Sequence, residues 1–207
     1  MKKILIGIVS ILFIAVIYLW WYIHSGSQHI PPHFHANFAV FVWGSRIDFS
    51  PDKYMEDIAG CSITGKISAR DRVHLHENNG DTIHVHHDGV TWGHFFSNNN
   101  IAFWEDFLKL DTGEMFTTQD DTWVLYILNG KRVENPFNTL INSEDKLLIS
   151  YGDHNWDYSL EDLYDQVSSN AWEYNSKYDP GSCGWTNENG VKVIIRELIN
   201  SFTHWQH

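Results

Sequence analysis

Basic residues are scarce in this sequence. Its 207 residues include 14 Lys and Arg against 26 Asp and Glu, which gives a formal charge of -12 with His neutral. An acidic surface repels phosphate, so the composition predicts no nucleic-acid partner. The sequence also lacks a Gly-x-Ser-x-Gly motif and a glycine-rich phosphate loop. These absences argue against a serine hydrolase of the nucleophile-elbow type and against a nucleotide site.

Cysteine is scarce as well. The two cysteines, Cys61 and Cys183, form no Cys-x-x-Cys pair, which argues against thiol-disulfide exchange as the activity. Outside the reducing cytosol they could form one disulfide, and two buried free thiols are the alternative.

Hydrophobic, aromatic and histidine residues are plentiful. Hydrophobic residues make up 43% of the chain and charged residues 19%, which excludes a disordered chain, collagen and a coiled coil. The chain has 12 Phe, 10 Trp, 9 Tyr and 13 His, and nine of the His fall between His29 and His94. The length fits one domain, or two small ones, and is enough for a real core. The clustered His are the unusual feature of the composition.

An apolar run of 20 residues, 4–23, follows Lys2 and Lys3 and ends in the aromatic stretch 18–22. A helix of this length spans about 30 Å of hydrocarbon, and aromatic residues favour the membrane interface. The positive-inside rule then places the N-terminus in the cytoplasm and the remainder of the chain outside. We expect a single-pass anchor; a cleaved signal peptide is the alternative, although its apolar region is usually shorter.

The remaining chain divides into three expected parts. Residues 24–32 form a polar stalk, residues 33–152 a His-rich β domain, and residues 153–207 a helical extension packed on it. The expected strands are 34–42, 46–49, 73–76, 82–86, 107–110, 114–116, 123–128, 131–133 and 146–151. Thr91 and Ser159 are expected N-caps, the latter of a helix through Ala171, and 191–202 a closing helix. The fold class is therefore α+β, mainly antiparallel, with an N-terminal transmembrane helix and C-terminal helices.

Three His-x-His repeats lie in the expected strands. Because side chains alternate along a strand, each repeat places both imidazoles on one face. The candidate metal ligands are His33, His35, His74, His76, His84 and His86. The other His are isolated surface or stalk residues and are not candidates.

The loop of the hairpin 73–86 decides whether its four His share a face. Residues that face each other in an antiparallel pair have numbers with a constant sum. Loops 78–80 and 79–81 give sums of 158 and 160, which place all four His together, whereas a two-residue turn at 79–80 separates the pairs. We favour 78–80, because Gly80 at the third position suits a type I turn followed by a G1 bulge.

Imidazole ligands outside the cytoplasm, with no thiolate nearby, favour copper or zinc over calcium or magnesium. Glu77 and Asp81 flank the cluster and could orient imidazoles or act as a general base. A cupin is not indicated, because Glu77 directly follows His76 and points to the other face.

Several motifs resemble an uncharacterised family of membrane-anchored bacterial and archaeal proteins. They are His33-Phe34-His35, the segment 73–84 with its His-x-His-Glu, Gly80 and Ile83-His84, the helix motif 91–96, Leu128-Asn129-Gly130 and the segment 145–152. The resemblance marks His33, His35, His74, His76 and His84 as site residues and Gly80 as the turn residue. This chain has Glu77 where the pattern has Asp and Trp92 where it has Leu. The family supports a metal site and indicates no substrate.

Three functions fit these observations. The first is a membrane-anchored metal-binding protein that handles copper or zinc. The second is a metal-dependent enzyme, a hydrolase or a copper redox enzyme, with one open coordination position. The third is an interaction module in which the His cluster is structural or pH-sensing.

Overall fold

The computed structural model describes residues 2–25, 32–56, 68–153 and 159–176, and the chain divides into the units 1–31 and 32–207. In the first unit, helix α1 (Lys2–Ser25) exposes apolar side chains that include Ile11, Phe13 and Trp20. Within the described ranges, no helix combines the length and the hydropathy of a membrane span. Both cysteines, most of the expected stalk and the expected helix 191–202 lie outside the described residues.

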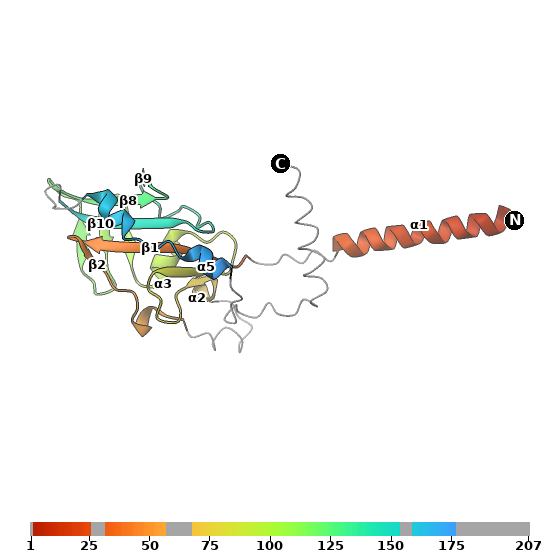
Figure 1. Ribbon diagram of the computed structural model, residues 1–207, viewed down its shortest axis with the longest axis horizontal. Helices are drawn as coiled ribbons and strands as arrows, with labels where there is room; N and C mark the ends of the chain where they lie inside the picture. Colours follow the sequence, from red (N-terminus) through yellow and green to blue (C-terminus); the bar gives the residue numbers. More distant parts are fainter. Residues whose placement is uncertain (1, 26–31, 57–67, 154–158, 177–207) are drawn as a thin grey trace. The chain divides into compact units, whose positions relative to one another are not determined.

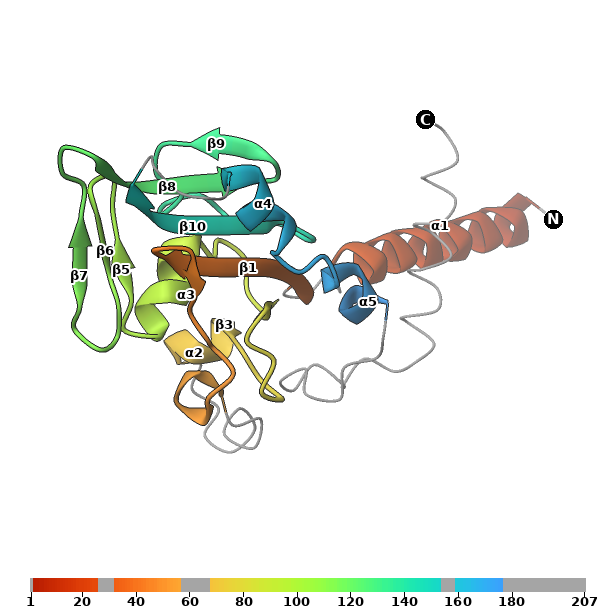
Figure 2. The same ribbon diagram turned by 60° about the vertical axis from the view of Figure 1, so that its left-hand side comes forward.

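A seven-stranded mixed sheet organises the second unit, so the α+β class with mainly antiparallel pairing is confirmed (Figures 1 and 2). Its strand order is β3-β4-β1-β10-β8-β9, and β2 pairs with β1. The bounds are β1 (Phe34–Val42), β2 (Ser45–Arg46), β3 (Val73–His74), β4 (Thr82–Val85), β8 (Thr122–Leu128), β9 (Lys131–Val133) and β10 (Lys146–Asp153). A separate three-stranded sheet consists of β5 (Ala102–Phe103), β6 (Phe107–Lys109) and β7 (Met115–Thr117).

Strand β1 lies at the centre of the larger sheet. It pairs antiparallel with β4 on one side and parallel with β10 on the other, with Asn37 opposite Lys146 and Val42 opposite Tyr151. Both β1 and β10 are buried on both faces, as expected for strands at a parallel pairing. The parallel pair was not predicted from the sequence, because the alternation of side chains within each strand does not identify its partner.

The two faces of β1 carry different chemistry. Ala36, Phe38 and Val40 point into the larger hydrophobic core. Ala39 and Phe41 point to the opposite face, where they join a smaller apolar cluster with Leu163 and Val167 of the C-terminal segment. His35 and Asn37 have the same parity as Ala39 and therefore lie on this second face.

Short helices cover the sheet, and side-chain caps fix where three of them begin. They are α2 (Ala69–Arg72), α3 (Trp92–Asn98), α4 (Leu160–Asp165) and α5 (Ala171–Asn175), with a 3-10 helix at Asp52–Tyr54. Thr91 and Ser159 are N-caps, as predicted. Both form capping boxes, and Ser68 caps α2 in the same way. The single helix predicted from Ser159 through Ala171 is wrong, because α4 ends at Asp165 and α5 begins only at Ala171.

Two predicted strands have only half of their expected length. Strand β2 ends at Arg46 rather than at residue 49, and β3 ends at His74 rather than at His76. The turn between β3 and β4 also differs, because the positive φ angles are at Glu77 and Asn78 and not at Gly80. Asn79 N-H donates to the His76 carbonyl across these two residues, as in a type I′ turn.

A polar contact joins the 3-10 helix to the β6–β7 turn. Asp111 accepts from Lys53 Nζ at 2.5 Å and from the Tyr54 hydroxyl at 2.9 Å. Burial disfavours the charged form of Asp111, but these hydrogen bonds outweigh burial and lower the pKa of the carboxyl below its ordinary value. The charged carboxylate therefore stabilises the fold above about pH 4, and its contribution is lost as the pH falls through the lowered pKa.

The variant Asp111→Asn is accordingly expected to have a lower free energy of unfolding than the wild type at neutral pH. The difference should narrow below about pH 4, because the wild-type carboxylate then becomes protonated. Urea unfolding at a series of pH values measures it, with Asp120→Asn, at an exposed position, as the control. A difference that stays constant into the acid range would contradict the assignment.

Candidate metal centre

Three strands bring the histidines to one end of the second sheet face. His33 precedes β1 and His35 lies on it, His74 lies on β3, and His84 lies on β4. His84 is opposite His35 on one side and His74 on the other. The pairing of His74 with His84 has a sum of 158, so the favoured hairpin register is confirmed. His86 N-H continues this register by donating to the Arg72 carbonyl at 2.9 Å.

The closest set of ligand atoms comes from His33, His35 and His84. One ring nitrogen of each lies within 4.8 Å of the others, close enough for the three to hold a metal ion. His35 Nε2 and His84 Nδ1 are 2.8 Å apart. His35 and His84 are each 1% exposed, whereas His33 is exposed, so the set is reached from solvent on the His33 side.

The other three histidines extend this set. His76 Nε2 lies 2.9 Å from the same His84 Nδ1. The His86 ring stacks between His33 and His74, with centroid separations of 4.7 Å and 4.9 Å. All six candidates therefore form one cluster. Five of the six are buried, and His33 is the exposed one.

The cluster offers ring nitrogens that could hold a metal ion. Buried imidazoles next to one another gain little from packing and repel when protonated, so their arrangement is best satisfied by a shared cation. Neutral imidazole suits zinc, copper, nickel and iron, and a ring nitrogen binds zinc at about 2.0 to 2.1 Å. His35 Nε2 and His76 Nε2 lie 2.8 Å and 2.9 Å from His84 Nδ1, so nitrogens of three rings adjoin one another.

Helix α5 covers this end of the sheet, beside the start of β1 in both views (Figures 1 and 2). The Tyr174 ring lies 5.6 Å from the His35 ring, and its hydroxyl accepts from Asn79 Nδ2. Asn175 Oδ1 accepts from His35 N-H at 2.9 Å and lies 2.8 Å from His35 Nδ1. Neither residue of α5 could be identified from the sequence, because their partners lie far away along the chain.

A buried polar contact fixes α5 to β1. Asn37 Oδ1 accepts from Ala171 N-H at 2.9 Å, and Asn37 Nδ2 donates to Asn170 Oδ1 at 2.7 Å. Thr82 of β4 also donates to Asn170 Oδ1, at 2.9 Å. Asn37 follows His35 on the same face, so the strand that carries the ligand also holds the helix above it.

The acidic residues beside the cluster have other roles. Asp81 binds Arg46 Nη2 at 2.6 Å through one carboxylate oxygen and accepts from Ser168 Oγ at 2.8 Å through the other. Glu77 is exposed at the turn. The geometry therefore gives no support to either residue as a general base at the cluster.

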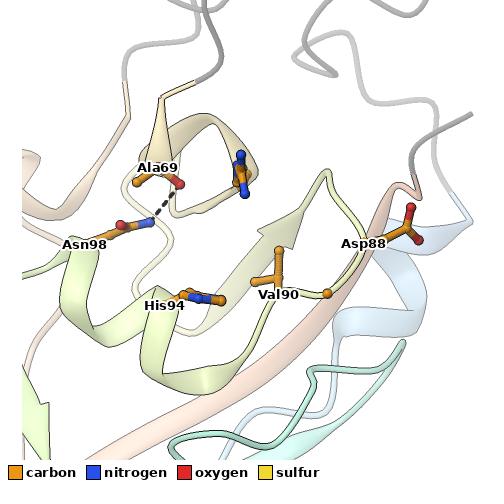
Figure 3. A pocket seen from close by; sticks show the side chains of 7 residues that line it. Ala69, Asp88, Val90, His94 and Asn98 are labelled. Carbon is orange, nitrogen blue, oxygen red and sulfur yellow. Dashed lines mark hydrogen bonds between the residues drawn. The ribbon is translucent and has the colours of Figure 1, made fainter.

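A cavity of about 200 Å³ lies between α2, α3 and the segment 88–90 (Figure 3). His94 lines it together with Ala69, Asp88, Val90 and Asn98, and Asn98 Nδ2 donates to the Ala69 carbonyl at 3.0 Å. His94 Nδ1 accepts from Thr91 N-H, so this imidazole completes a helix cap. The cavity is lined by none of the six clustered histidines.

Comparison with models of protein families, with curated proteins and with solved structures finds no match to this chain.

Proposed function

We propose that this protein is a membrane-anchored, extracytoplasmic metal-binding protein that holds copper or zinc at its histidine cluster for metal acquisition, delivery or buffering. The observation that carries the proposal is the approach of ring nitrogens from His33, His35 and His84 to within 4.8 Å of one another. Three further imidazoles adjoin this set. The cluster thus has more imidazoles than one ion needs, and this surplus suits exchange of the ion between neighbouring positions.

Metal handling is favoured over catalysis by the side chains around the cluster. A hydrolytic zinc site uses an acidic or basic group to activate the bound water. Of the two acidic candidates, Asp81 is held by Arg46 and Ser168, and Glu77 is exposed at the turn. The exposed position of His33 suits transfer of an ion to or from a partner, because the ion can leave through an exposed ligand.

The membrane anchor rests on the sequence. The apolar run 4–23 has the length and the flanking lysines and aromatic residues of a signal anchor. The resemblance to a membrane-anchored family points in the same direction. With this anchor the His cluster faces the outside of the cell, where copper and zinc are the relevant ions for imidazole ligands.

The test is the metal content of the full-length protein, extracted from membranes with detergent and purified without added metal or chelator. We expect copper or zinc at about one equivalent or more by elemental analysis, and recovery from the membrane fraction tests the anchor. In His35→Ala/His84→Ala the metal should be lost, because two buried ligands of the closest set are removed.

The matched control is His87→Ala/His94→Ala, which removes two histidines outside the cluster and should retain the metal. His33→Ala provides a second test at an exposed position, where folding is least affected, and it should weaken binding. Wild-type protein that holds no copper or zinc, even after reconstitution, would overturn the proposal.

A further inference from the structure

Asn175 makes two contacts with His35 that together define the protonation of its ring. The carboxamide oxygen accepts from the backbone N-H of His35 at 2.9 Å and lies 2.8 Å from Nδ1 of the same residue. The carboxamide nitrogen donates to Ser143 Oγ at 3.0 Å and faces Glu144 Oε1 at 3.4 Å. One side chain from α5 thus joins a candidate ligand to the segment before β10.

The orientation of the Asn175 carboxamide follows from its partners. A backbone N-H can only donate, so the atom that faces it is the oxygen. A carboxylate can only accept, so the atom that faces Glu144 is the nitrogen. Both ends of the carboxamide agree, and the oxygen therefore lies against His35 Nδ1.

The His35 tautomer follows in turn. The amide oxygen only accepts, so His35 Nδ1 carries the proton and donates it to Asn175. In the neutral ring, Nε2 is then the nitrogen with the lone pair. It is this Nε2 that lies 2.8 Å from His84 Nδ1, on the side of the ring where the candidate ligand atoms meet.

We propose that Asn175 is a positioning residue of the metal site, which holds His35 in the Nδ1-protonated tautomer and so presents Nε2 to the ion. The proposal rests on the proposed function, because it assigns a partner to one of the metal ligands. The residue acts from the C-terminal segment, 140 positions away from His35. Helix α5 is therefore part of the site and not only a cover for it.

The experiment uses full-length protein in detergent micelles with 15N-labelled histidine. Long-range proton-nitrogen spectra of the metal-free protein report which ring nitrogen is protonated, and His35→Gln identifies the signals of His35. Zinc chloride competed against a chromogenic chelator gives the affinity. We expect a protonated Nδ1 and an unprotonated Nε2 at His35 in the wild type.

In Asn175→Ala we expect a mixture of His35 tautomers and a fall in zinc affinity of about 10-fold, the lower end of the range for partners of metal-bound His. The lower end applies because Asn175 is exposed, so water replaces part of the lost hydrogen bond. Asn175→Asp/Glu144→Gln keeps the acceptor without setting two carboxylates against each other, and it should restore both the tautomer and most of the affinity. Ser143→Ala is the matched control, because it removes the contact at the other end of the carboxamide.

Two results would overturn the assignment, and they are distinguishable. If the wild type binds zinc but Asn175→Ala leaves the His35 tautomer and the affinity unchanged, Asn175 is not a positioning residue. If the wild type shows the expected tautomer but binds neither zinc nor, in the same competition, copper, the proposed function fails and the hydrogen bond is structural. Restoration by Asn175→Asp/Glu144→Gln separates positioning from a general effect on folding.

Discussion

Replacing Phe38 by Ala is expected to lower the free energy of unfolding by about 3 to 5 kcal/mol, the range for truncation of a buried Phe. Phe38 is fully buried on the core face of β1. Its ring contacts the rings of Phe49, Phe95 and Phe96 at centroid separations of 5.0, 4.9 and 5.6 Å. These three partners come from the loop after β2 and from α3, so they cannot close the cavity without moving separate elements.

The same variant tests whether the core face of β1 can be changed without affecting metal binding on its other face. Phe38 points away from the histidine cluster, so by the proposed function the folded fraction of Phe38→Ala should bind the same amount of zinc as the wild type. Urea unfolding followed by tryptophan fluorescence measures stability, and elemental analysis measures the metal. Met115→Ala, at an exposed position on β7, is the control and should change stability by less than about 0.5 kcal/mol. A small effect of Phe38→Ala would show that the rings around it do not form the main core.

The parts of the fold that depend on neighbouring residues could be predicted from the sequence. Thr91 and Ser159 cap helices because each hydroxyl accepts from the backbone N-H three residues later. The side chain at that later position accepts in turn from the backbone N-H of the cap residue. The strand β8, the turn at Asn129-Gly130 and the strand β9 follow from alternation and a turn that needs positive φ. Each of these signals is complete within about ten residues of chain.

The parallel pairing of β1 with β10 could not be predicted in this way. Alternation identifies a strand but carries no information about its partner, and strands buried on both faces lose even the alternation of polar and apolar residues. The break between α4 and α5 was missed for a similar reason. Leu163, Val167 and Ala171 keep a helical spacing although the intervening chain turns, because all three point toward the sheet.

In the candidate site too, residues with a local pattern could be predicted and residues without one could not. The six histidines could be identified because His-x-His in strands and a hairpin register need only local spacing, and the sum of 158 placed His74 opposite His84. The contacts of Asn175 and Tyr174 with the cluster could not be identified, because a single Asn or Tyr in a short helix carries no motif. Residues that orient ligands from distant segments are found from the structure.

Gly80 is needed in the hairpin loop, as predicted, but its role differs from the predicted one. The expected role was a positive φ angle in the hairpin loop, but the positive φ angles belong to Glu77 and Asn78. A Cβ at position 80 would instead lie 2.7 Å from the Phe49 carbonyl carbon and from Ser50 N, both backbone atoms that cannot rotate away. Gly80 is needed for space, since two segments of backbone approach each other there.

The variant Gly80→Asn distinguishes the two roles, because Asn tolerates positive φ but has a Cβ. We expect it to lower the free energy of unfolding by about 2 to 3 kcal/mol, the upper part of the range for overpacking. Gly89→Asn is the matched control: its φ is +72°, nothing lies within 4 Å of its Cβ position, and the change should be below about 1 kcal/mol. Equal effects of the two substitutions in urea unfolding would contradict this, because they would show that Gly80 is needed for its backbone conformation and not for space. Because Gly80 lies between His76 and His84, displacement of the loop should also weaken zinc binding, whereas Gly89→Asn should leave it unchanged.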